Sequence, residues 1–231
     1  MVKRIAVLLA LIAGAGAALA QAPARSNAVE MTCPIDGSRF KYQPAPPNPS
    51  NELFLDMRPA TRGGLDWPLA KCPGNGFVLF DGYTQDKLPT LRPIVQSDAY
   101  RAAANVHSTH YLAAQLMNYS AMPAYDVAWS LVRATWEVSA DPAKYSQYAK
   151  DALSVYESLG PTKDIPRRQR VIKEMISGEL ERRLGQFDDA KKRFSSIRDE
   201  AEFTTPVLQR VIQLQLKLIA AKDSGIHRMP N

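Results

Sequence analysis

From residue 84 onward, apolar side chains recur every three or four positions, which is the spacing of amphipathic helices. Helix-start signals divide this pattern, among them Ser108 as an N-cap, Pro123 at a helix start, and Asp141 followed by Pro142. The pattern predicts six helices joined by short turns, which pack as antiparallel hairpins. Their expected starts are near residues 108, 123, 141, 164, 188 and 205, and the last ends near 222.

Residues 31–83 show no helical period, because prolines remove backbone donors and interrupt helices throughout this stretch. The apolar run Phe77–Phe80 predicts a short strand, and residues 38–42 are its expected hairpin partner. This part of the chain is therefore expected to form a small, loop-rich β module. Phe54 and Trp67 are the aromatic side chains expected to cover the disulfide that is predicted below for this module.

The first twenty residues predict an export signal. Lys3 and Arg4 precede an apolar run that is short for a membrane span, and Ala18-Leu19-Ala20 supplies the small residues of a cleavage site. Cleavage near Ala20 would place the protein in the periplasm or outside the cell, with a flexible lead over residues 21–30. An uncleaved N-terminal anchor is the alternative.

Removal of this signal lowers the formal net charge from +6 to +4. This modest surplus and an exported location exclude nucleic acid as the expected partner. No later run approaches eighteen consecutive apolar residues, so no membrane span is expected in the mature chain.

The chain has two cysteines, Cys33 and Cys72, and each begins a Cys-Pro-x-x-Gly turn. A metal knuckle would carry a second cysteine in each turn, where this sequence has Asp36 and Asn75. Thiols tend to pair in an oxidising compartment, and an asparagine amide is a poor zinc ligand, so we expect a disulfide and no metal. A zinc site using Cys33, Cys72, Asp36 and an outside ligand, or two free thiols, are the alternatives.

The stretch ISGELERRLGQFDDAKKRFSSI, residues 176–197, resembles a tetratricopeptide repeat. The resemblance implies that a glycine lets two helices approach, a small residue keeps them close, and aromatic residues fill the groove between neighbours. At the end of the repeat, Glu202 stands where a proline is usual, so a helical hairpin is expected rather than a regular solenoid. The matching residues are Gly178, Gly185, Phe187, Ala190, Phe194 and Ile197.

Cys-Pro-x-x-Gly turns followed by such helices resemble an uncharacterised bacterial family that joins a Cys-Pro-x-Cys-Gly knuckle to tetratricopeptide-like helices. The resemblance covers residues 31–222 and implies a mainly α fold. It divides the chain into a degenerate zinc-ribbon-like module over 31–83 and a helical, tetratricopeptide-like domain over 84–231. Because Asp36 and Asn75 depart from the family pattern, the zinc site of the family is not expected in this chain.

No motif for nucleophilic, phosphate-binding or metalloprotease chemistry is present, so neither catalytic residues nor a cofactor is expected. His107 and His110 have a spacing that could bind a metal, but no third ligand is indicated, and ordinary surface or capping roles are expected.

Trp129 and Trp136 lie seven apart on one predicted helix and are expected to pack one hairpin on the next rather than line a ligand groove.

A cluster of basic residues falls on the predicted helix that begins near residue 164. It is expected to form either a solvated convex face or a surface that binds anions or an acidic partner. The cluster comprises Arg167, Arg168, Arg170, Lys173, Arg182 and Arg183.

The leading hypothesis is an exported, non-enzymatic helical-repeat module that binds an unidentified protein or peptide of the cell envelope. The alternative is an envelope enzyme or small-ligand binder with a pocket between the β module and the first helices. His107, His110, Asp81 and Trp67 are the candidates for that pocket. A metal carrier using the degenerate knuckle is the third hypothesis.

Overall fold

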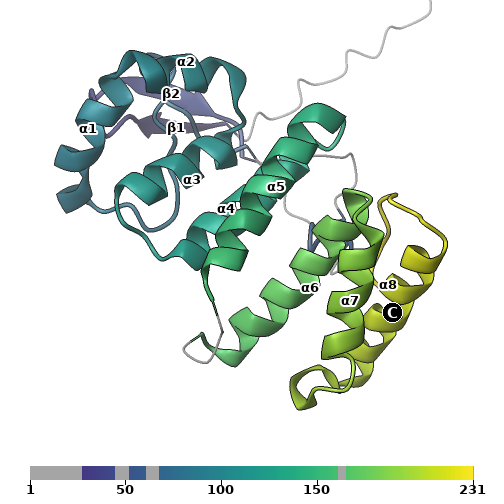
Figure 1. Cartoon of the computed structure of the whole chain (residues 1–231). Helices are drawn as coiled ribbons and strands as arrows, with labels where there is room; N and C mark the ends of the chain where they lie inside the picture. The colour runs from purple at the N-terminus through teal and green to yellow at the C-terminus, as the bar shows by residue number, and fades with distance from the viewer. Residues whose placement is uncertain (1–27, 45–51, 61–67, 161–164, 231) are drawn as a thin grey trace, which may run out of the picture.

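The computed structural model describes residues 28–44, 52–60, 68–160 and 165–230. This part of the chain contains eight α-helices and one small antiparallel sheet, which confirms the expected mainly α fold with a small β module (Figure 1). The expected export signal and Trp67 lie outside the described residues. None of the described helices has the length and apolar character that crossing a membrane requires.

The sheet pairs β1 (Val29–Thr32) with β2 (Arg39–Tyr42), and Met31 lies opposite Phe40. The helices follow in chain order. They are α1 (Leu88–Gln96), α2 (Asp98–Val106), α3 (Thr109–Tyr119), α4 (Ala124–Glu137), α5 (Pro142–Ser158), α6 (Arg167–Arg183), α7 (Phe187–Ile197) and α8 (Pro206–Ala220).

The strand pairing differs from the expectation. The partner of β2 is β1, which includes residues assigned above to a flexible lead, and residues 77–80 do not pair with β2. The second turn instead forms its own single bridge, between Lys71 and Val78. Each Cys-Pro turn reverses the chain locally, so the segments that flank the same turn meet at the lowest loop-closure cost.

Helices α3 to α8 begin where the start signals predicted, and Asp141 and Thr205 cap α5 and α8 by accepting backbone N–H bonds. Helices α1 and α2 were not predicted. Pro93 lies inside α1, and Ser97 accepts the N–H of Tyr100 to begin α2 directly afterwards. The apolar spacing extends into this segment, but no helix was assigned there, because prolines disfavour a helix interior.

Two cores hold the helices. The first joins the Cys-Pro turns to α1–α5 and contains fully buried Leu91, Leu112 and Tyr156. The second lies among α6–α8 around Phe194 and Ile212. Figure 1 shows α6, α7 and α8 side by side at one end of the molecule, with the sheet, α1 and α2 at the other.

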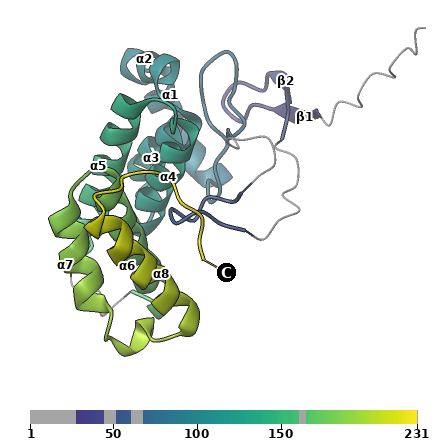
Figure 2. The same ribbon diagram turned by 90° about the vertical axis from the view of Figure 1, so that its right-hand side faces the viewer.

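The segment between the two Cys-Pro turns leaves the β module and joins the C-terminal end. Leu55 N donates to His227 O at 2.9 Å, and Met229 N donates to Leu53 O at 2.8 Å. In Figure 2, the yellow tail runs beside this dark blue segment. Phe54 lies against Arg58, with the guanidinium carbon 4.5 Å from the ring centroid, and not at the disulfide that it was expected to cover. Residues 52–60 therefore stabilise the helical end of the molecule.

Candidate functional site

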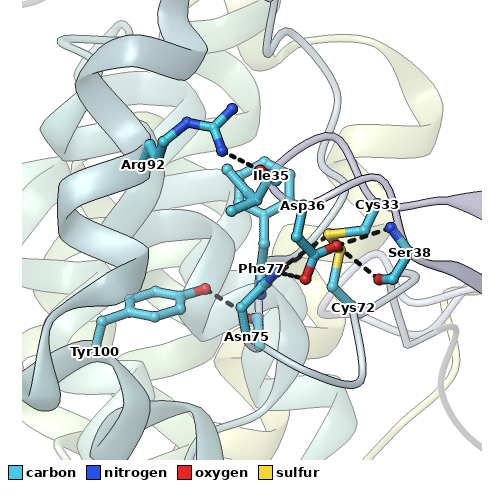
Figure 3. Close-up of a disulfide and its surroundings, with 10 residues drawn as sticks. Cys33, Ile35, Asp36, Ser38, Cys72, Asn75, Phe77, Arg92 and Tyr100 are labelled. Atoms are coloured by element: carbon cyan, nitrogen blue, oxygen red, sulfur yellow. Dashed lines mark hydrogen bonds between the residues drawn. A yellow bond between two sulfur atoms is a disulfide. The ribbon is translucent and has the colours of Figure 1, made fainter.

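The two Cys-Pro-x-x-Gly turns lie against each other and share one backbone geometry (Figure 3). Gly37 N donates to Cys33 O at 2.9 Å, and Gly76 N donates to Cys72 O at 3.0 Å. The two glycines have φ angles of 75° and 76°, in the left-handed region that glycine adopts without steric cost. The repeated sequence motif thus produces a repeated structure.

All four positions at which paired knuckles would bind a metal contact one another. Cys33 and Cys72 form the expected disulfide, and both are almost completely buried. Beside it, Asn75 Nδ2 donates to Asp36 Oδ2 at 2.8 Å and lies 3.3 Å from Cys33 Sγ. Among the described residues, no group of three or more His, Cys, Asp or Glu side chains is placed to hold a metal ion.

Asp36 and Asn75 play the same part in their respective turns. Asp36 Oδ1 accepts the backbone N–H of Ser38 at 2.9 Å, and Asn75 Oδ1 accepts that of Phe77 at the same distance. The hydroxyl and backbone N–H of Ser38 are the main reasons that the pKa of Asp36 lies below its ordinary value. These bonds hold each turn closed from within.

Helices α1 and α2 each hold one turn (Figure 3). Arg92 of α1 donates to the carbonyl of Ile35, and Tyr100 of α2 donates to the carbonyl of Gly76 at 3.0 Å. A Cβ at Gly76 would come within 2.7 Å of the Ala104 side chain, so the close approach of α2 requires glycine there. The disulfide and the bonds from both helices make the paired turns a structural cross-link.

The residues that resemble a tetratricopeptide repeat lie on α6, on α7 and in the turn that joins these helices. A Cβ at Gly178 would meet two ring atoms of Phe194 at 2.5 Å, so glycine allows the aromatic ring to lie against α6. Gly185 has a φ of 77° just after α6, where the chain turns into α7. Ala190, Phe194 and Ile197 are buried, and Phe187 packs partly buried against the same core.

The basic residues of α6 do not form a common surface, in contrast to the expectation. Lys173 is buried, and Arg183 lies 4.0 Å above a tyrosine ring of α5. Arg170 pairs with a carboxylate in the turn before α8, which leaves Arg167 and Arg168 exposed. Because α6 lies between α5 and the last two helices, most of its cationic side chains find partners inside the molecule.

Arg182 is the most enclosed member of this set, with no exposed surface. Its guanidinium donates to Glu179 at 2.8 Å, to Gln215 of α8 at 3.0 Å, and to the carbonyl of Gly225 at 2.8 Å. Burial raises the pKa of Glu179, and Arg182 opposes that rise. The residue assigned to a binding surface instead ties α6 to α8 and the C-terminal tail.

A groove with a volume of about 450 Å³ opens between α3 and α5. Buried Ala114, Val127 and Leu131 give it an apolar floor. Its walls are polar, because residues three and four apart on each helix lie on one face. These wall residues are Tyr111, Gln115 and Asn118 on α3, and Asp151, Ser154 and Ser158 on α5.

An aromatic stack adjoins the groove through Tyr111, whose ring lies 4.3 Å from that of His107 and 4.2 Å from that of Tyr148, measured between centroids. Tyr111 also donates to Asp151 Oδ2 at 2.9 Å. His107 Nδ1 lies 3.0 Å from the Tyr148 hydroxyl, and partial burial lowers its pKa. His107 therefore belongs to this stack and does not meet His110.

The two Cys-Pro turns and the residues that flank them, 28–44 and 68–83, are called the turn module below. A second cavity, of about 320 Å³, lies between this module and the α3–α4 hairpin. The module contributes Leu69, Phe80 and Asp81, and α3 contributes His110. Two of the four residues proposed for a pocket at this place, Asp81 and His110, thus line one cavity.

A buried carboxylate orients His110. Its Nδ1 lies 2.8 Å from Glu137 Oε1, and its backbone N–H donates to Glu137 Oε2 at 3.1 Å. Burial raises the pKa of Glu137, but the hydrogen bonds from His110 and Thr109 outweigh this effect, so the pKa lies below its ordinary value. Glu137 is therefore an ionised acceptor that fixes the imidazole.

Helix α4 supplies a stripe that the sequence analysis did not assign to a site. Asp126, Trp129 and Arg133 line the second cavity, and the Arg133 guanidinium lies 6.0 Å from the Trp129 ring centroid. Trp129 also meets Trp136 edge to face at 5.8 Å. The spacing of three and four residues was the available signal, because it places a carboxylate, an indole and a guanidinium on one face of a predicted helix.

No family model matches this sequence, and no curated protein or solved structure matched it either.

Proposed function

We propose that the protein is an exported, non-enzymatic module that binds an extended protein or peptide segment in the groove between α3 and α5. The observation that carries this proposal is the combination of an apolar floor with polar walls along two neighbouring helices. Helical hairpins commonly present concave surfaces of this kind to partner chains. The predicted export signal makes the periplasm or the extracellular space the proposed location.

The walls of the groove suit a peptide backbone. The amides of Gln115 and Asn118 each offer a donor and an acceptor, which is what a peptide unit requires of a partner. Asp151 is the ionisable carboxylate of the groove and favours a partner with a basic side chain. Val127 and Leu131 would take an apolar side chain from the same segment.

We also infer that the paired turns are a zinc-ribbon-like module in which a covalent bond does the work of a metal. The equal φ angles of Gly37 and Gly76 and the matched bonds of Asp36 and Asn75 support this inference. The module would then hold α1 and α2 in place rather than bind a ligand.

Panning of a random peptide library against the mature, disulfide-bonded protein tests the proposal. We expect enriched peptides that combine apolar and basic residues. The variant Ser154→Trp fills the groove from an exposed wall position and should weaken their binding by at least about tenfold, since it blocks access to the floor. Ser195→Trp, at an exposed position of α7, is the matched control and should leave binding unchanged.

Absence of any enriched peptide would contradict the proposal. Equal binding to the wild type and to the Ser154→Trp variant would also contradict it, because the bound segment would then lie elsewhere.

A second candidate function is binding of a small ligand between the turn module and α3–α4. The observation in its favour is that Asp81 and His110, which are 29 positions apart in the sequence, line a single cavity.

A further inference from the structure

The cavity beside the turn module carries side chains of both charge signs. Asp81 and Asp126 line it as carboxylates, and Arg133 lines it as a cation. Within the described parts of the chain, none of these three side chains forms an ion pair or a hydrogen bond. Elsewhere in the molecule, buried or half-buried arginines such as Arg182 and Arg193 are paired with carboxylates. Unpaired charges of both signs at one cavity therefore suit a ligand that carries one positive and one negative group.

The remaining lining is apolar and aromatic. Phe80, Met117, Met122 and Trp129 contribute to it, and thioether and aromatic groups adapt to apolar side chains of different shape. A volume of about 320 Å³ lies at the small end of the range for ligand pockets. The cavity thus fits a compact molecule with one apolar portion. It is too small to enclose a segment of a polymer.

His110 adds an oriented hydrogen-bonding group. Because the Glu137 carboxylate engages Nδ1, a neutral His110 carries its proton there and keeps the lone pair on Nε2. No described residue is hydrogen-bonded to Nε2. This nitrogen is suited to accept an N–H from a ligand ammonium.

We propose that this cavity binds a free amino acid with an apolar side chain. Arg133 would bind the α-carboxylate, and Asp81, Asp126 and His110 would surround the α-ammonium. The side chain would lie among the methionines and Trp129. This site is separate from the peptide groove, because the two cavities are lined by different residues of the α3–α4 hairpin except for Met122, which lines both.

Isothermal titration of the mature, disulfide-bonded protein with L-phenylalanine, L-leucine and L-methionine tests the proposal. At least one of them should bind with a Kd below about 1 mM. The matching amino acid amide lacks the carboxylate, and the matching deaminated acid lacks the ammonium. Each analogue should bind at least about tenfold more weakly, because one of the two charged contacts is lost.

Two variants assign the contacts. Arg133→Met should weaken the amino acid at least about tenfold and leave the amide unchanged, whereas Asp126→Asn should weaken the amino acid and leave the deaminated acid unchanged. Asp151→Asn removes a carboxylate from the peptide groove and is the matched control, which should not alter amino acid binding. Circular dichroism of each variant verifies that it is folded.

The proposal is overturned if none of the three amino acids binds at millimolar concentration, or if the amide and the deaminated acid bind as well as the parent. Equal loss of affinity in Asp151→Asn and Asp126→Asn would move the bound ligand to the peptide groove and would also overturn it. Because peptide binding is measured with Ser154→Trp, failure of either proposal leaves the other standing.

Discussion

The side chains of Asp36 and Asn75 explain how two knuckle-like turns keep their shape with one sulfur each. Both accept the backbone N–H two residues further on, and they are joined by a hydrogen bond of 2.8 Å next to the disulfide. A carboxylate and an amide can therefore replace the acceptor function of a metal-binding cysteine without replacing its affinity for metal. Hydrogen bonding by these two side chains maintains the local fold of the turns.

The variant Asp36→Asn tests this role through pH. Hydrogen bonds from Ser38 lower the pKa of Asp36 in the folded protein, so its contribution to stability is present above the unfolded pKa and is lost as the pH falls through the folded value. Asparagine keeps one oxygen to accept from Ser38 and does not titrate, but it places an amide nitrogen where Oδ2 accepts from Asn75. We expect a lower free energy of unfolding at pH 7, because the ionised acceptor and the bond from Asn75 are lost, and a smaller further loss on acidification to pH 3, measured by urea denaturation. A larger loss on acidification than in the wild type would contradict this role.

Gly178 is the residue on which the contact between α6 and α7 depends. Gly178→Ala adds a methyl group 2.5 Å from the Phe194 ring, so we expect a loss of about 1–3 kcal/mol in the free energy of unfolding, although alanine favours helices more than glycine does. Gly74→Ala is the control, because its Cβ would meet Asp36 at an ordinary 3.6 Å, and it should shift stability by less than about 0.5 kcal/mol. A neutral or stabilising Gly178→Ala would show that the helices are not in close contact there.

At the scale of elements, the C-terminal helices are joined by the hydrogen bonds of buried Arg182 and by the segment between the turns. Arg182 connects α6 to Gln215 of α8 and to the carbonyl of Gly225. The tail beyond it pairs with residues 52–60, which bring Leu55 into the second core. The arrangement of α6–α8 thus depends on residues that are remote in sequence.

Arg182→Met should destabilise the protein by about 3–5 kcal/mol, because it leaves the Glu179 carboxylate buried without its cation. Adding Glu179→Gln to this variant should recover part of the loss, since the uncompensated charge is removed. Arg198→Met, which removes an exposed pair with Asp199, is the control and should leave stability almost unchanged, because solvent screens exposed pairs. Denaturant unfolding of the single and double variants measures these differences. If Arg182→Met behaved like Arg198→Met, the buried ion pair would not exist.

The elements that the sequence predicts well are those with local signals. Asp141 and Thr205 cap helices at the expected positions, and the apolar period indicates α3–α8. Pro93 hid α1, and pairing of β2 with residues 77–80 was wrong because an apolar run does not specify its partner strand. The basic residues of α6 could not be placed, because their burial depends on partners that are remote in sequence, such as Gln215 for Arg182 and Asp56 for Arg183.

The residues of the candidate sites also fall into those that the sequence indicates and those that only packing reveals. Asp81 and His110 could be associated from sequence, because the turn module precedes the first helices and was expected to pack on them. Glu137 and Arg133 were missed, although their spacing along α4 was visible, because only the packed structure shows which helix face meets the module. The groove between α3 and α5 follows from helix packing and has no sequence motif of its own.

For the whole molecule, the disulfide joins two turns that are 39 residues apart, and those turns lie in the same core as α1–α5. Closure of a loop of this length restricts the unfolded chain by about 4 kcal/mol in the entropic model. The variant Cys33→Ala/Cys72→Ala should therefore lose about 2–4 kcal/mol of unfolding free energy, measured by urea denaturation under non-reducing conditions. A loss below about 1 kcal/mol would show that the bond is not the main restraint on the module.

The central claim is that a covalent sulfur–sulfur bond holds the paired turns together without an ion. Intact mass spectrometry of the mature protein, unfolded and treated with iodoacetamide before and after reduction, tests it most directly when metal content is measured on the same sample. We predict a chain that begins at Gln21, no alkylation before reduction, two alkylated cysteines after reduction, and no stoichiometric metal. Two thiols alkylated without reduction, or one metal ion per chain, would contradict the claim.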